Sequence, residues 1–128
     1  MVLTGQVTDV LPLLAAMDIG VLCSKGESLS NAIIEYMVAS LPCVVSDVGG
    51  NREAIGGEHG LVFPGDDVDG MVEQLERLIE NPELRNQLGR SGERYARETY
   101  EYSVVVGQHE ELYNRYLAAS GRDIGGEK

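Results

Sequence analysis

Two glutamates, Glu27 and Glu35, stand eight positions apart and are the best candidates for ligand binding in this sequence. Glu27 falls in a loop and Glu35 about one turn into the next helix, which places their carboxylates roughly 6–10 Å apart at the rise of a helix. A diphosphate spans such a gap. Because carboxylates only accept hydrogen bonds, they suit the hydroxyls of a ribose on one side and of a hexose on the other. The alternative for Glu35 is a solvated position on an amphipathic helix.

The loop 24–30 leads directly into that helix, so the backbone N–H groups of the first turn point toward whatever lies at the helix end. A helix N-terminus stabilises an anion by about 0.3–1 kcal/mol, and by up to roughly 2 kcal/mol where it is partly buried. In the alternative interpretation, Ser28 or Ser30 simply caps the helix. The segment therefore predicts either an anion site or an ordinary capped helix.

Apolar runs alternate with helical stripes along the chain. Ile19–Cys23 and Pro42–Ser46 are apolar enough for parallel strands covered on both faces, and Asn31–Leu41 carries a helical stripe between them. This alternation predicts an α/β fold, a Rossmann-like parallel sheet with flanking helices, whose ligands bind at the carboxyl ends of the strands. The loops 24–30 and 47–51 follow the two strands and are the places to look for a site.

The rest of the chain continues this pattern and ends in helices. The remaining predicted elements are a short strand at Val2–Thr4, a helix at Thr8–Met17, a short helix near Asn51–Ile55, a strand at Leu61–Phe63, a helix from Val68 capped by Asp66 or Asp67, a helix after Asn81-Pro82, and a last helix capped by Ser103 and reaching about Ala118. We expect residues 1–119 to form one partial domain and residues 120–128 a flexible tail.

Composition excludes several classes of protein. The 128 residues suffice for one domain, and 10 basic against 21 acidic residues give a net charge of −11, so nucleic acid is not expected as a partner. No apolar stretch approaches the roughly 20 residues of a membrane span, which indicates a cytoplasmic protein. We interpret Cys23 and Cys43 as buried free thiols, with a disulfide or metal pair as the alternative, and His59 and His109 as structural or surface residues.

Several ordered motifs together resemble a known family. The run Ser24–Met37, with its Glu-x7-Glu spacing, resembles the donor-site signature of retaining glycosyltransferases of the GT-B fold, the group 1 or GT4-type family. The resemblance extends over nearly the whole chain and includes a strand, double glycine and glutamate at Pro42–Glu53, a turn at Gly60–Asp66, and closing helices at Asn81–Arg85 and Tyr102–Tyr113. It implies the latter part of a GT-B C-terminal domain.

The resemblance implies roles for individual residues. Glu35 would bind the ribose hydroxyls of a nucleotide-diphosphate sugar, and Glu27, as the catalytic residue, would face the transferred sugar in a positioning or electrostatic role. Backbone amides near the start of the helix would hold the distal phosphate, and the double glycine would let the backbone approach the donor, although an ordinary strand-to-helix turn is the alternative. The implied donor-binding residues besides Glu35 are Ser28, Leu29, Ser30, Asn31, Gly49 and Gly50. No metal or other cofactor is expected.

This chain departs from the family's pattern in three places. Family members usually have glycine where Ser28 stands and alanine where Tyr36 and Val38 stand, so the packing of the helix is expected to be tighter here. Lys25 and Arg52 are the only basic residues near the two loops, and such residues are needed to stabilise a departing diphosphate.

The N-terminal acceptor domain of the family has no counterpart in this sequence, so we expect a fragment that is inactive alone, with peripheral membrane association left open for the full-length protein. A non-catalytic nucleotide-sugar-binding or interaction module is the alternative function. In the family's strand order, the edge of Ile19–Cys23 would be left open. We expect this edge to be satisfied by Val2–Thr4, by self-association with another copy, or by distortion.

Overall fold

The computed structural model describes residues 1–120, and a three-stranded parallel sheet lies at its centre. The strands are β1 (Gly20–Leu22), β2 (Cys43–Asp47) and β3 (Leu61–Pro64), in that order across the sheet. In this register Gly20 lies beside Cys43, and Val44 lies beside Leu61. All three carboxyl ends therefore meet at one edge of the sheet.

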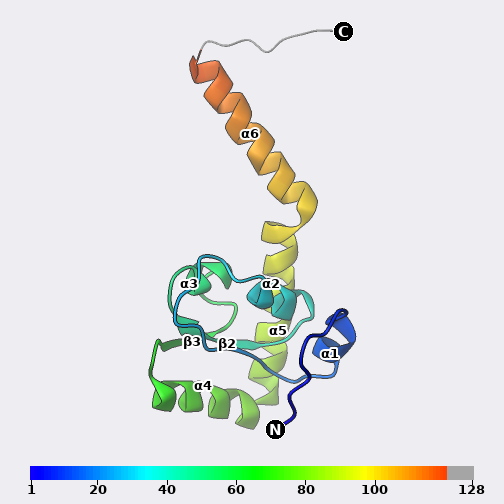
Figure 1. The fold of residues 1–128 in the computed structure, drawn as a ribbon, viewed down its shortest axis with the longest axis vertical. Coiled ribbons are helices and arrows are strands. Elements are labelled where there is room, and N and C mark those ends of the chain that lie inside the picture. The colour runs from blue at the N-terminus through cyan, green and yellow to red at the C-terminus, as the bar shows by residue number, and fades with distance from the viewer. Residues whose placement is uncertain (121–128) are drawn as a thin grey trace. The chain divides into compact units, whose positions relative to one another are not determined.

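Helices cover both faces of the sheet. The helices are α1 (Leu11–Ala15), α2 (Asn31–Val38), α3 (Asn51–Ala54), α4 (Val68–Glu80), α5 (Pro82–Tyr100) and α6 (Tyr102–Ser120). In Figure 1, α2 and α3 lie on one side of β2 and β3, and α4 lies on the other side. The predicted α/β fold class, with its parallel sheet, flanking helices and helical C-terminal part, is confirmed.

Contacts divide the chain into two compact units, Met1–Arg97 and a second that begins at Glu98. The sheet and the helices α1 to α4 belong to the first unit, and α6 belongs to the second. Residues 121–128 of the predicted tail lie outside the described residues.

The core of the first unit forms around the central strand β2. Val44 and Val45 have no exposed surface, because β2 has a strand on each edge and helices on both faces. On the α4 side, Val44 packs with Phe63, Leu78 and Leu88. Full burial of side chains this size contributes about 1.5–3 kcal/mol each, so the continuous apolar run that predicted this strand is also what stabilises it.

Two predicted caps are present and one is wrong. The Asp67 Oδ1 atom accepts a hydrogen bond from the Gly70 N–H at 2.9 Å, which fixes the start of α4. Asn81 caps α5 in the same way, ahead of Pro82. Ser103 is not the cap of α6, because that helix begins at Tyr102 and the N–H groups of Val104 and Val105 bond to the carbonyl oxygen of Glu101.

The prediction of a strand at Val2–Thr4 is wrong. Residues 1–10 form neither helix nor strand, and Val2 and Leu3 are largely exposed. A strand is stable only where a neighbouring strand forms hydrogen bonds with its N–H and C=O groups, and a short apolar run does not show that such a neighbour exists. As a result β1 is an edge strand in the described part of the chain, and Val2–Thr4 does not complete the sheet.

The predicted helix at Thr8–Met17 is confirmed only in its central part, as α1. Pro12 occupies the first turn, where its missing N–H has no intrahelical partner to lose, so the helix begins at Leu11 and not earlier. In residues 1–120, no helix is both long and apolar enough to cross a membrane.

Candidate functional site

The loops that follow β1 and β2 interlock through their backbones. The Gly50 N–H donates a hydrogen bond to the carbonyl oxygen of Glu27 at 3.3 Å. A Cβ atom on Gly49 would overlap that same carbonyl oxygen, and a Cβ atom on Gly50 would overlap the carbonyl oxygen of Ser28. Gly49 also has a φ of 52°, which favours glycine. The double glycine is therefore required by the close approach of residues 27–28.

The start of α2 lies directly after this interlocked loop. Ser30 occupies the N-cap position with φ −90° and ψ 117°, but no side chain accepts a hydrogen bond from the first turn there. Ser30 is 6% exposed, whereas Ser28, Leu29 and Asn31 are exposed. Ser30 thus takes the position of a cap without acting as one, and the first backbone N–H groups have no capping side chain.

Glu27 is held by Ser24, which is itself bonded to Ser46, at the carboxyl edge of the sheet. The Ser24 hydroxyl donates to Glu27 Oε1 at 3.0 Å, and the Ser46 hydroxyl donates to the Ser24 carbonyl oxygen at 2.9 Å. Glu27 is half-buried and Glu35 is exposed. The side chain of Glu27 therefore has a fixed hydrogen-bond donor, while the carboxylate of Glu35 lies open to solvent.

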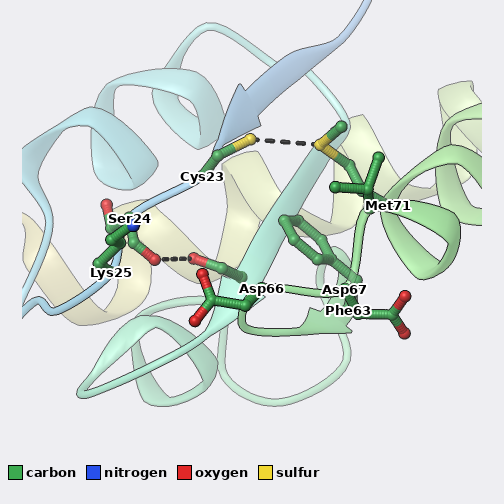
Figure 2. Close-up of a pocket in the computed structure, with 9 residues that line it drawn as sticks. Cys23, Ser24, Lys25, Phe63, Asp66, Asp67 and Met71 are labelled. Carbon is green, nitrogen blue, oxygen red and sulfur yellow. Dashed lines mark hydrogen bonds between the residues drawn. The ribbon is translucent and has the colours of Figure 1, made fainter.

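A pocket of about 230 Å³ opens beside this network (Figure 2). All three strand ends and the start of α4 line it, with the residues Cys23, Ser24, Lys25, Ser46, Phe63, Asp66, Asp67, Val68 and Met71. Figure 2 shows Cys23 and Met71 pointing toward one another, with their sulfur atoms 3.3 Å apart. The pocket therefore has apolar walls with lysine, serine and aspartate groups among its lining.

The two basic residues near the loops have different surroundings. Arg52 binds Asp47 through two hydrogen bonds of 3.1 and 2.6 Å, and these bonds hold the pKa of the Asp47 carboxyl below its usual value. Lys25 lines the pocket and is exposed. Because Arg52 is already paired with Asp47, Lys25 is the one of these two basic residues that can bind an anionic ligand.

The sequence missed several residues of this pocket, notably Phe63, Asp66 and Met71. A signal was present, since Phe63 and Asp66 lie at the end of the third strand and ligands gather at such ends. The sequence predicts Asp66 only as a possible helix cap. The role of Met71 depends on how α4 crosses the sheet, which sequence patterns do not show.

The structure confirms the histidine predictions and part of the cysteine prediction. Cys23 and Cys43 are both free thiols, but only Cys43 is buried, where burial raises its pKa to about 12. Cys23 is exposed because β1 is an edge strand. His59 has a structural role, since its ring stacks on Tyr95 and its Nδ1 atom lies 3.0 Å from the Ser91 hydroxyl. His109 is exposed on α6, as expected for a surface residue.

These features define the class of the protein. A parallel sheet with helices on both faces carries, at the carboxyl ends of its strands, an uncapped helix start, a hydrogen-bonded glutamate and a pocket, which makes it an α/β domain with these features at the edge where such domains bind ligands. Residues 1–81 match the family described as glycosyl transferases group 1, and the chain belongs to that family.

Curated relatives cover most of the chain and are much longer than it. N-acetyl-alpha-D-glucosaminyl L-malate synthase of Bacillus anthracis is 30% identical over 110 residues, which are 85% of this chain and 29% of that protein. Phosphatidyl-myo-inositol mannosyltransferase of Mycolicibacterium smegmatis is 34% identical over 120 residues, which are 90% of this chain and 31% of that protein. The chain thus spans about three tenths of each of these relatives.

A solved structure has the same fold. Sucrose-phosphate synthase from Thermosynechococcus elongatus superimposes with a TM-score of 0.76 over 86% of this chain and 28% of that one, at 24% sequence identity. The chain therefore has the fold of part of a GT-B glycosyltransferase domain, as predicted.

Proposed function

We propose that this chain is the donor-binding portion of a retaining glycosyltransferase, which transfers a hexose-type sugar from a nucleotide-diphosphate donor to an acceptor. The observation that carries the proposal is the start of α2, which lacks a capping side chain and follows directly on the loop of Glu27. The distal phosphate binds the backbone N–H groups of Leu29, Ser30 and Asn31, because free N–H groups and the helix dipole both favour an anion there.

The two glutamates contact the donor on either side of the diphosphate. Glu35, which is exposed, accepts hydrogen bonds from the ribose hydroxyls. Glu27, fixed by Ser24, faces the transferred sugar and positions it or stabilises its developing positive charge. The interlock with Gly49 and Gly50 holds the Glu27 loop in place. In this proposal no metal ion takes part.

We further propose that the catalytic protein is longer than this chain, since the relatives are about three times its length. These relatives are a synthase and a mannosyltransferase, and a sugar-transferring activity is what this chain would share with them. The remaining part of the protein supplies the acceptor domain, and the protein acts in the cytoplasm. The free edge of β1 pairs with a further strand of the longer chain. Self-association through this edge is the alternative, and light scattering distinguishes a monomer from a dimer.

Calorimetric titration with UDP-glucose and GDP-mannose tests the proposal. Glu35→Ala is expected to weaken binding at least tenfold, because hydrogen bonds to a charged group contribute about 1.5–3 kcal/mol. Glu58→Ala, which removes an exposed glutamate from the loop before β3, is the matched control and should bind as the wild type does. Equal affinities for the Glu35→Ala and Glu58→Ala proteins would refute the assignment.

A non-catalytic nucleotide-sugar-binding module is the second candidate. The observation that favours it is the pairing of Arg52 with Asp47, which leaves Lys25 as the cation near the two loops in residues 1–120. A helix terminus and one lysine stabilise a leaving diphosphate weakly. Expression of the complete reading frame with an assay of donor hydrolysis separates the two candidates, because a module binds the donor without turning it over.

A further inference from the structure

Tyr36 joins α2 to the edge strand β1 through two contacts. A Cβ atom placed on Gly20 would lie 2.6 Å from the Cγ and Cδ2 atoms of the Tyr36 ring, so the ring lies directly against the glycine backbone. The Tyr36 hydroxyl donates a hydrogen bond to the carbonyl oxygen of Val21 at 3.3 Å. Both contacts depend on the tyrosine side chain, since an alanine at this position would make neither.

The apolar side of α2 does not by itself fix the position of the helix along the sheet. Ile33 and Met37 have no exposed surface and fix the depth of the helix above the sheet. One apolar stripe allows a helix to roll or slide along the sheet, because dispersion contacts are not directional. Tyr36 adds a directional hydrogen bond at the side where the sheet ends. Burial is the first cause of its raised pKa, followed by the charges of Cys43 and Glu35, so the hydroxyl keeps the proton that it donates.

We propose that Tyr36 is a positioning residue for Glu35, the residue before it on α2, and holds the Glu35 carboxylate at a fixed place relative to β1. The inference rests on the proposed function, in which Glu35 binds the ribose of the donor. The tyrosine ring sets the distance between helix and strand, and its hydroxyl fixes the helix along the strand. Gly20 contributes to this positioning, because any larger residue at this position would displace the Tyr36 ring.

Tyr36→Phe tests the hydroxyl while it keeps the ring. Affinities for UDP-glucose and GDP-mannose are measured by calorimetry on variants whose circular dichroism shows the folded state, so a loss of stability alone does not change them. We expect Tyr36→Phe to bind up to roughly tenfold more weakly than the wild type, because the lost hydrogen bond lowers the share of molecules in which α2 holds the binding position, and one hydrogen bond sets the upper limit of this effect. Tyr113→Phe removes a hydroxyl from an exposed tyrosine of α6 and should leave the affinity unchanged.

A double-mutant cycle with Glu35→Ala separates positioning from a general effect on the fold. If Tyr36 acts through Glu35, Tyr36→Phe causes no further loss of affinity once Glu35 is absent. If the same loss appears in the presence and absence of Glu35, Tyr36 does not act through it and the inference is overturned. Unchanged affinity for Tyr36→Phe overturns it as well, and the proposed function survives provided that Glu35→Ala weakens binding. Unchanged affinity for Glu35→Ala itself refutes the proposed function.

Gly20→Ala gives a second, independent variant. The added methyl group displaces the ring of Tyr36, and binding is expected to weaken. With Tyr36→Ala there is no ring to displace, so the combination of Gly20→Ala with Tyr36→Ala should bind as Tyr36→Ala alone does. A Gly20→Ala protein that is folded and binds as the wild type does would show that the position of the ring has no effect on Glu35.

Discussion

Gly50→Ala adds one methyl group at the point where the loops after β1 and β2 meet. The new Cβ atom overlaps the carbonyl oxygen of Ser28 and lies 3.0 Å from its carbonyl carbon. Both are backbone atoms, which cannot rotate away as the end of a side chain can. The φ of Gly50 is −87°, an ordinary value for alanine, so the substitution tests the close approach and not the backbone conformation.

The magnitude follows from two losses and one gain. Overpacking costs about 1–3 kcal/mol, and loss of the hydrogen bond from the Gly50 N–H to Glu27 costs about 0.5–1.5 kcal/mol. The smaller conformational freedom of alanine in the unfolded chain offsets about 0.4–1 kcal/mol. We therefore expect the free energy of unfolding to fall by about 0.5–4 kcal/mol. Donor affinity should fall too, because the displaced loop carries Glu27.

Urea unfolding followed by circular dichroism measures the change in stability, and calorimetry measures the affinity. Gly26→Ala is a matched control in the same loop, since a Cβ atom there meets nothing within 4 Å and Gly26 has no positive φ. It should be as stable as the wild type or more stable. If Gly50→Ala were as stable as Gly26→Ala and bound the donor equally well, the two loops would not depend on each other, and the reasoning would be wrong.

Two further predictions concern stability. Burial raises the pKa of Cys43 from 9.0 to about 12, so the neutral thiol stabilises the fold fully below pH 9 and this contribution is lost as the pH rises toward 12. In urea unfolding between pH 9 and 12, Cys43→Ala should therefore lose less stability than the wild type. An equal loss of stability in both proteins would contradict this reasoning. Asp67→Ala removes the cap of α4 and should lower the free energy of unfolding by about 0.5–2 kcal/mol, whereas Asp67→Asn, which caps as well, should retain most of it. Equal losses in both Asp67 variants would show that capping is not the cause.

The fold was predictable where local patterns were sufficient. The buried run at Pro42–Ser46 and the stripe at Asn31–Leu41 became β2 and α2, because each carries its own burial pattern in sequence. The segment Val2–Thr4 has the composition of a strand but no neighbour, and pairing is a property of the whole fold. The exposure of Cys23 has the same origin, since a sequence does not show which strand forms an edge.

The sequence predicts where the candidate site lies but not how its residues are arranged. The rule that ligands bind at the carboxyl ends of parallel strands selected the two loops that the structure brings together. The structure shows a reason for the double glycine that the sequence did not indicate, because the backbone of Glu27 and Ser28 fills the space beside it. That the glycines also let the donor approach, and that a diphosphate spans the gap between Glu27 and Glu35, stay predictions.

Backbone amide chemical shifts during titration with UDP and GDP test the central claim most directly. If a diphosphate binds the start of α2, the amide signals of Leu29, Ser30 and Asn31 shift in a saturable way with either nucleotide, and those of Gly49 and Gly50 follow because their loop is interlocked with Glu27. Saturable shifts confined to another part of the molecule, with the amides of 29–31 unmoved, would contradict a donor site at this helix.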